Sequence, residues 1–412
     1  MVVRQGRLFR GWYVVAATFA ILFAGFGCTY AYGAFFVSLE SEFMANRAEV
    51  AAVFSYAAGL LFISGAFSGP LSDKIGPRPV VAAGALTMIF GLWRAAAADS
   101  LAGVTIWFSV GLGLGLGFVY VPSIGSVQRW FLLRRGLASG IAVTGIGLGT
   151  FLMPIAAGQL LLVMSWREVF GLMSLLIAVL CLPAIRFLDT DPAAYGLHPD
   201  GVDRLPPVAA VAAEKSSIRE LVVTRSFVQL YVSSVILSFA LLVPFVHLAP
   251  YAVDASVPPH LAATLVGLIG IGSTLGRLLI GGVADRIGRL RTLVTLYLTL
   301  ALAYLWWLGA TTYPFLAAFS VFYGIAYGAS IALMPAILAD YFGAARVGSI
   351  IGLQYTSAAV GSLFGPVLAG VIFDLNGSYS LWLVVGCILC VIAAALLATT
   401  PRPVLAAGTQ GT

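Results

Sequence analysis

The chain has 412 residues, of which 61% are hydrophobic and only 9% are charged, and its mean hydropathy is +1.02. Because a soluble domain carries about 25% charged residues, this composition excludes an ordinary soluble protein and indicates an integral membrane protein. The net charge of +6 is spread over short loops between apolar runs, which excludes a single basic face for nucleic acid.

Apolar runs long enough to cross a membrane recur along the whole chain. A helix needs about 20 apolar residues to span the ~30 Å hydrocarbon layer, so the pattern predicts an all-α integral membrane fold with about twelve transmembrane helices. The first run is longer than the roughly 7 to 15 residues of a cleavable signal core, and we expect it to be the first spanning helix. In chain order, the predicted helices are 11–38, 50–70, 79–98, 101–128, 136–163, 168–187, 226–252, 261–283, 292–309, 314–339, 348–373 and 379–400.

A polar stretch separates the first six predicted helices from the last six. We therefore expect an N-terminal half at 1–187, a cytoplasmic linker at 188–225 and a C-terminal half at 226–412. Lys and Arg are concentrated in the loops on the side of the linker and of both chain ends. The positive-inside rule places that side in the cytoplasm of a cell (inner) membrane.

The two predicted halves repeat each other. Segment 69–78 reads GPLSDKIGPR and segment 281–289 reads GGVADRIGR, so Asp73 and Gly76 correspond to Asp285 and Gly288 at an offset of 212 residues. Two halves in the same orientation, with a site between them, are typical of a membrane carrier.

These motifs resemble those of the major facilitator superfamily over nearly the whole chain. Segment 130–145, WFLLRRGLASGIAVTG, resembles the motif that opens helix 5 of monocarboxylate transporters, with departures at Trp130, Leu133 and Thr144. RGWY at 10–13 weakly resembles their motif before helix 1 but lacks its acidic residue. The resemblance, which extends to oxalate/formate antiporters, implies two pseudo-symmetric six-helix halves that work by alternating access.

The repeated loop also carries a candidate conformational latch. The resemblance implies that Asp73 with Arg78, and Asp285 with Arg289, stabilise the outward-open state. A carboxylate at the end of one helix can accept hydrogen bonds from the next helix N-terminus, and a nearby arginine can pair with it. The alternative is that these residues only cap turns and set topology.

Arg277 is the most informative single residue, because it lies inside a run that is otherwise apolar, small or hydroxylic. A charge at the centre of a membrane helix costs ~2.5–3.5 kcal/mol on insertion scales. Asp285 follows eight residues later, or ~12 Å along a helix, which places Arg277 near mid-depth. We expect it to face the cavity between the halves and to bind an anion; the alternative is that it extends to the cytoplasmic surface.

The remaining candidates concern the substrate. A guanidinium offers two parallel donors that match one carboxylate, and helix 348–373 lacks the lysine that the oxalate/formate relatives carry there, so a single cation favours a monocarboxylate. Tyr120, Tyr327 and Tyr355 lie well inside their helices and are candidates to contact the substrate, with ordinary aromatic packing as the alternative.

Proton coupling needs a group that titrates. His247 and Asp254 lie seven residues apart and so on one helix face, and both are candidates for it. The alternative for Asp254 is an ordinary capping role at the helix end.

The sequence thus predicts a secondary transporter and not an enzyme, since it shows no cluster of nucleophile, base and acid. We expect symport of a small monocarboxylate such as L-lactate or pyruvate with a proton, by a single chain that needs the lipid bilayer but no cofactor, metal or nucleic acid. The alternatives are proton-independent exchange of organic anions and, more remotely, a transporter-like sensor.

Overall fold

The computed structural model describes residues 9–131, 134–188, 192–201, 218–342 and 347–401. Within these ranges the chain is helical and contains no strand. Twelve helices or joined helix pairs are long and apolar enough to span a bilayer, which confirms the predicted all-α membrane fold and the number of spans.

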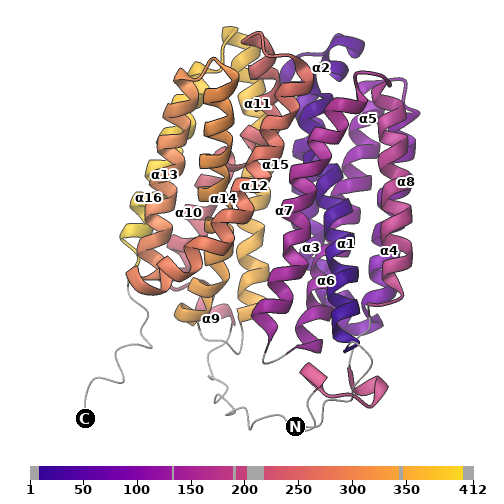
Figure 1. The fold of residues 1–412 in the computed structure, drawn as a ribbon. Coiled ribbons are helices and arrows are strands. Elements are labelled where there is room, and N and C mark those ends of the chain that lie inside the picture. The colour runs from indigo at the N-terminus through magenta and orange to yellow at the C-terminus, as the bar shows by residue number, and fades with distance from the viewer. Residues whose placement is uncertain (1–8, 132–133, 189–191, 202–217, 343–346, 402–412) are drawn as a thin grey trace.

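The first six spans form one side of the molecule, drawn in indigo to magenta in Figure 1. Two of them are composite, since α1 continues into α2 and α5 continues through a π-helical segment, η1, into α6. The elements are α1 (Gly11–Tyr30), α2 (Tyr32–Phe43), α3 (Arg47–Ile75), α4 (Pro77–Ala96), α5 (Leu101–Phe108), η1 (Ser109–Leu114), α6 (Gly115–Trp130), α7 (Arg135–Leu160) and α8 (Trp166–Ile185).

The last six spans form the other side, drawn in salmon to yellow in Figure 1. They are preceded by three short linker elements: η2 (Pro192–Tyr195), η3 (Pro199–Gly201) and α9 (Ile218–Val222). The spans are α10 (Arg225–Leu241) joined to α11 (Val243–Asp254), α12 (Pro259–Ile287), α13 (Arg289–Gly309), α14 (Tyr313–Phe342), α15 (Val347–Asn376) and α16 (Ser380–Ala398).

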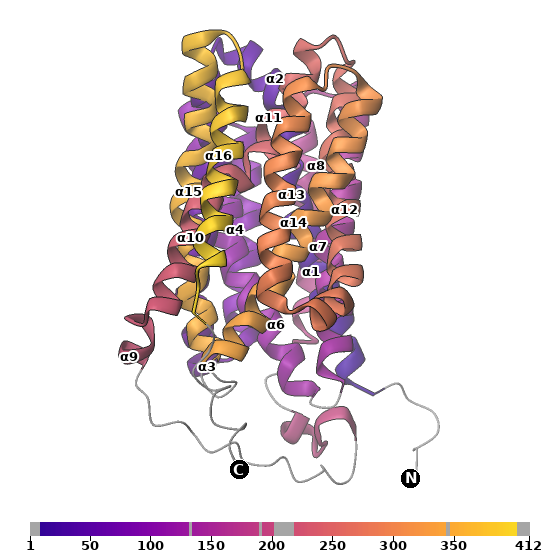
Figure 2. The ribbon, with the colours of Figure 1, turned by 90° about the vertical axis from the view of Figure 1, so that its left-hand side faces the viewer.

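The linker elements mark one end of the molecule. Helix α9 lies at the lower end in Figures 1 and 2, whereas α2 and α11 lie towards the upper end. We call these the linker end and the distal end. Of the predicted linker, residues 189–191 and 202–217 lie outside the described ranges.

The repeated motif forms the same turn in both halves. Gly76 ends α3 with φ +86°, and Gly288 ends α12 with φ +103°. Residues other than glycine rarely adopt such positive φ values. The glycines of the sequence repeat therefore allow each spanning helix to reverse into the next.

Both halves also break their first span near the distal end. The first break lies at Ala31, between α1 and α2, and the second at Leu242, between α10 and α11. Pro244 explains the second break, because it has no N–H to offer the carbonyl of Ala240. The hydroxyl of Tyr304 donates to that carbonyl instead, at 2.6 Å.

The halves contact each other mainly through α3 with α15 and α7 with α12. Glycines bring these pairs close towards the distal end: a Cβ on Gly370 would lie 2.6 Å from Ala48 Cα, and one on Gly270 would lie 2.7 Å from the Phe151 backbone nitrogen. Nearer the linker end, Gly140 of α7 and Gly352 of α15 have nothing within 4 Å of a Cβ position. The described contacts therefore close the distal end and leave the halves separated towards the linker end.

Candidate functional site

A cavity near the middle of the molecule lies between the two halves and contains Arg277. Helices α1 and α7 contribute to it from one half, and α11, α12 and α14 from the other. Its lining residues are Tyr30, Ile146, Gly147, Thr150, Phe245, Gly270, Ser273, Arg277 and Tyr327. Arg277 thus lines a cavity between the two halves.

Within the described residues, Arg277 has no acidic partner. Its Nε atom is buried without a hydrogen-bond partner, and none of the ion pairs among these residues includes it. A permanently charged side chain with a buried, unused donor is costly unless an anion reaches it. The geometry therefore supplies the cation and the free donor that a carboxylate ligand needs.

Two phenol groups line the cavity together with this cation. The hydroxyls of Tyr30 and Tyr327 lie 3.3 Å apart in it. Of the other predicted substrate contacts, Tyr355 lines a neighbouring cavity, and the ring of Tyr120 packs against Phe26. The lining of the central cavity therefore includes one of the three predicted tyrosines, Tyr327, together with Tyr30.

A second cluster, at the distal end, ties the two halves together through Arg47. This residue begins α3, and its side chain is only 9% exposed. Its guanidinium donates to both carboxylate oxygens of Asp254, the last residue of α11, at 2.6 and 2.7 Å. The same group donates to Glu40 at 3.1 Å and packs over the ring of Phe373, with 3.9 Å between Cζ and the ring centre.

The cluster continues from Arg47 to His247. Arg47 donates to the hydroxyl of Tyr379 at 3.0 Å, and that hydroxyl lies 2.9 Å from His247 Nδ1. Burial raises the pKa of Tyr379 despite the opposing charge of Arg47, so its phenol keeps its proton. The Pro366 carbonyl, 2.8 Å from His247 Nε2, can only accept. His247 therefore carries its proton on Nε2 and accepts from Tyr379, as a neutral ring.

A further acidic residue, Asp374, caps the N-terminus of α3. Asp374, near the end of α15, accepts from the backbone N–H groups of Arg47 and Ala48, each at 3.0 Å. Free N–H groups at a helix N-terminus attract carboxylates. We call Arg47, Asp254, Tyr379, His247 and Asp374 the distal network; it joins α3 of the first half to α11, α15 and the start of α16 in the second.

Two of the predicted latch residues form ion pairs within their own halves. Asp73 pairs with Arg129 of α6 at 3.0 Å, and Arg289 pairs with Asp340 of α14 at 2.8 Å. Arg78 donates to the backbone carbonyl of Arg186. Arg129 and Asp340 can reach these residues because α6 packs against α3 and α14 packs against α13.

The fourth predicted latch residue cannot be placed. The side chain of Asp285 lies outside the described residues. The ion pairs described at the linker end are each within one half, so they do not hold this end closed.

Comparisons with known proteins decide the family. A model of the Major Facilitator Superfamily matches residues 17–254 and, separately, residues 228–411. The chain belongs to the Major Facilitator Superfamily.

Within this superfamily the chain resembles monocarboxylate transporters. It is 28% identical over 400 residues to rat monocarboxylate transporter 13, covering 95% of this chain and 89% of the relative. Human monocarboxylate transporter 11 is 30% identical over 383 residues, covering 90% of this chain and 78% of the relative. These relatives identify the chain as a membrane transporter and not an enzyme.

A solved structure agrees with the fold. The crystal structure of a mutant peptide transporter POT in complex with sulfate has a TM-score of 0.73 and covers 96% of this chain and 95% of its own. At 15% identity, this similarity shows the major facilitator fold alone.

No metal centre is evident in the ranges that the structure describes, where no three His, Cys, Asp or Glu side chains could hold an ion.

The sequence predicted no role for Arg47 or Tyr379. The predicted helix begins at 50 and leaves Arg47 in a loop, whereas α3 begins at Arg47. The segment NRAE at 46–49 indicates the correct start of this helix, because Asn46 and Glu49 form a capping box. That box places Arg47 in the first helical turn, directed at the neighbouring helices.

Proposed function

We propose that this major facilitator protein carries a small monocarboxylate, such as L-lactate or pyruvate, and that Arg277 binds the substrate carboxylate. The observation that supports this most directly is the unpartnered Nε of Arg277 in a cavity shared by both halves. Tyr30 and Tyr327 are placed to donate to the carboxylate or to a substrate hydroxyl. The names of the relatives agree with this substrate class.

The proposal includes a proton as the co-substrate. Asp254 is the more suitable acceptor, because its side chain is 42% exposed whereas His247 is fully buried. Protonation of Asp254 removes the charge that holds Arg47, and so weakens the contact between the halves at the distal end. The proton and the opening of the distal end are coupled in this way, and His247 takes part through Tyr379.

We further propose that the linker end faces the cytoplasm of a cell membrane, so that the conformation described here is open inward. The concentration of Lys and Arg in the loops of that end supports this orientation. The halves 1–187 and 226–412 act as the two moving bodies around the central cavity, within a single chain.

Proton-independent exchange of anions is the second candidate. It is favoured by the absence, among described residues, of an acidic group beside Arg277. Closing the empty cavity around an unpaired cation costs free energy. A second anion, bound at Arg277 while the carrier returns to its first conformation, would remove this cost.

Uptake of radiolabelled L-lactate into proteoliposomes tests the proposal. The vesicles contain no anion substrate, and an inward proton gradient is applied or omitted. We expect accumulation that follows the gradient, collapses with a protonophore and is lost in Arg277→Ala. Uptake that ignores the gradient and requires oxalate or formate inside would replace symport by exchange, and full activity of Arg277→Ala would remove the anion site.

A further inference from the structure

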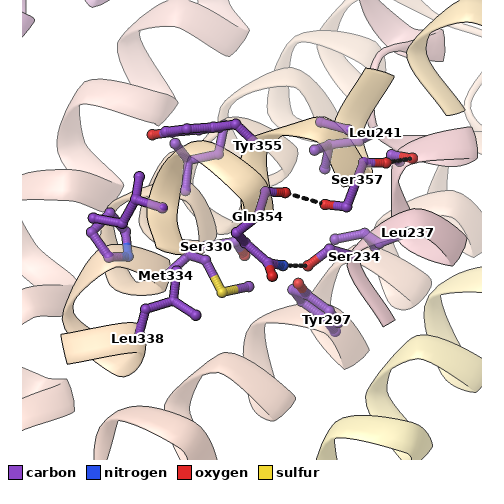
Figure 3. Close-up of a pocket in the computed structure, with 15 residues that line it drawn as sticks. Ser234, Leu237, Leu241, Tyr297, Ser330, Met334, Leu338, Gln354, Tyr355 and Ser357 are labelled. Carbon is purple, nitrogen blue, oxygen red and sulfur yellow. Dashed lines mark hydrogen bonds between the residues drawn. The ribbon is translucent and has the colours of Figure 1, made fainter. Parts of the chain in front are cut away.

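A second cavity lies inside the C-terminal half, beside the central one. Its volume is about 580 Å³ and that of the central cavity is about 220 Å³, and both values include space that is open to solvent. Figure 3 shows side chains of α10, α13, α14 and α15 around it, including Ser234, Tyr297, Met334 and Gln354. Its surface is mainly apolar, which suits the body of an organic ligand.

The two cavities are neighbours along the same membrane spans. On α14, Tyr327 lines the central cavity and Ser330, three residues later, lines the second. Phe245 of α11 lines the central cavity, and Leu241, the last residue of α10, lines the second. The short separation along both spans is the reason to consider one ligand that occupies both cavities.

One polar atom in the second cavity has no partner. Gln354 is only 4% exposed, and its Nε2 donates to Ser234 Oγ at 2.8 Å (Figure 3). The same nitrogen also donates to the Leu230 carbonyl at 3.3 Å. A carbonyl can only accept, so the side-chain nitrogen must face it and the amide orientation is fixed. Gln354 Oε1 is left buried without a hydrogen-bond partner.

The neighbouring hydroxyls do not supply that partner. Ser330 donates to the Ala326 carbonyl at 2.7 Å, and Ser357 donates to the Gln354 backbone carbonyl at 2.6 Å. An unpaired buried acceptor costs free energy unless a donor reaches it. The missing donor must therefore come from a molecule in the cavity.

We infer that the second cavity is a specificity pocket for the part of the substrate that lies away from its carboxylate. The transported monocarboxylate then carries an apolar, ring-sized body with a hydroxyl or N–H group. The carboxylate binds Arg277, the body fills the second cavity, and the hydroxyl or N–H donates to Gln354 Oε1. This inference rests on the proposed function, since it places the carboxylate at Arg277. The preferred substrates are then hydroxylated aromatic acids and their analogues, which are larger than L-lactate.

Binding to the purified carrier in detergent tests the inference without relying on transport. Isothermal titration calorimetry compares propanoate, 3-phenylpropanoate and 3-(4-hydroxyphenyl)propanoate on the unmodified protein. We expect the phenyl acid to bind at least about tenfold more tightly than propanoate, since its ring leaves water. The hydroxyphenyl acid should gain roughly a further fivefold from one hydrogen bond. Equal affinities for the three acids would overturn the inference before any variant is made.

Three variants then locate the effect. Gln354→Met keeps the length of the side chain but removes the acceptor, and should abolish the advantage of the hydroxyl while leaving that of the phenyl ring. Ala358→Leu, which adds bulk to a lining residue, should weaken both aromatic acids and spare propanoate. Val360→Leu is the matched control, because Val360 is 42% exposed on the same helix and does not line the cavity. A hydroxyl advantage that survives in Gln354→Met would refute the pocket.

Arg277→Ala separates this inference from the proposed function. Loss of binding of all three acids supports the carboxylate site that both share. If Arg277→Ala binds them unchanged, the proposed anion site fails. If Arg277→Ala loses binding but the acids show no preference in the unmodified protein, only the specificity pocket fails.

Discussion

Replacing Asp254 by asparagine should release the distal end of the molecule. The pair between Arg47 and Asp254 joins the two halves, so it exists only while this end is closed. Asparagine keeps the shape of the carboxyl group and one acceptor oxygen but removes the charge. The variant therefore imitates a protonated Asp254 at every pH.

The expected shift follows from the burial of the two partners. Removing one partner of a fully buried pair costs ~3–5 kcal/mol, and an exposed pair contributes only ~0–1 kcal/mol. Arg47 is 9% exposed and Asp254 is 42% exposed, so we place the loss between these limits at ~2 kcal/mol. Because ~1.4 kcal/mol is a factor of ten, the closed population should fall relative to the open one by roughly thirtyfold.

Distances between spin labels measure this shift. Ser41 on α2 and Leu375 on α15 are exposed positions at the distal end of opposite halves, and both can be replaced by cysteine. Cys387 is partly exposed and is replaced by alanine in the background. Double electron–electron resonance should show a longer-distance component that grows in Asp254→Asn.

Asp340→Asn is the control for this experiment. Asp340 is exposed to a similar extent, at 46%, and also pairs with an arginine, but both partners lie in the same half. Its removal should leave the distal distances unchanged. An unchanged distance distribution in Asp254→Asn, or an equal change in both variants, would refute the reasoning that the Arg47 pair holds the halves together.

Changes at three further positions probe the anion site, proton coupling and the helix contacts. Arg277→Ala should reduce lactate uptake to background and Arg277→Lys should impair it strongly, because an ammonium lacks the paired donors of a guanidinium; normal uptake by either would contradict the site. His247→Ala should flatten the dependence of uptake on the proton gradient, and an unaltered pH profile would exclude His247 from coupling. Gly270→Leu would place Cβ 2.7 Å from the Phe151 backbone, so we expect a loss of ~1–3 kcal/mol and a lower melting temperature. Gly140→Leu is its control, because a Cβ at Gly140 has no atom within 4 Å. Equal melting temperatures for the two variants would contradict the packing argument.

The spans and the central cation could be predicted from the sequence because both depend on a membrane as solvent. An apolar run of sufficient length has few alternatives to a spanning helix, and the twelve predicted spans agree with the twelve found. Arg277 stood out because a charge within such a run needs a reason. Its position among Tyr30 and Tyr327 follows from the packing of α1, α12 and α14, which no periodicity specifies.

The distal network shows what the sequence could not provide. Arg47 and Asp254 lie 207 positions apart, and Arg47 and Tyr379 lie 332 apart. Each is an ordinary polar residue near a helix end, and only the packing of the two halves brings them together. Asp73 likewise pairs with Arg129 of a neighbouring helix, α6.

The breaks at Ala31 and Leu242 have a consequence for how this protein can change over evolution. Each divides a span into a long rod and a short rod of 12 residues, α2 and α11, joined at one bend. The short rods carry Glu40 and Asp254, whereas Arg277 belongs to α12, which is unbroken. Substitutions that stiffen or loosen the bends can change the rate at which the distal end opens while Arg277 keeps its position on α12. Turnover rate and anion binding at Arg277 are thereby open to separate selection.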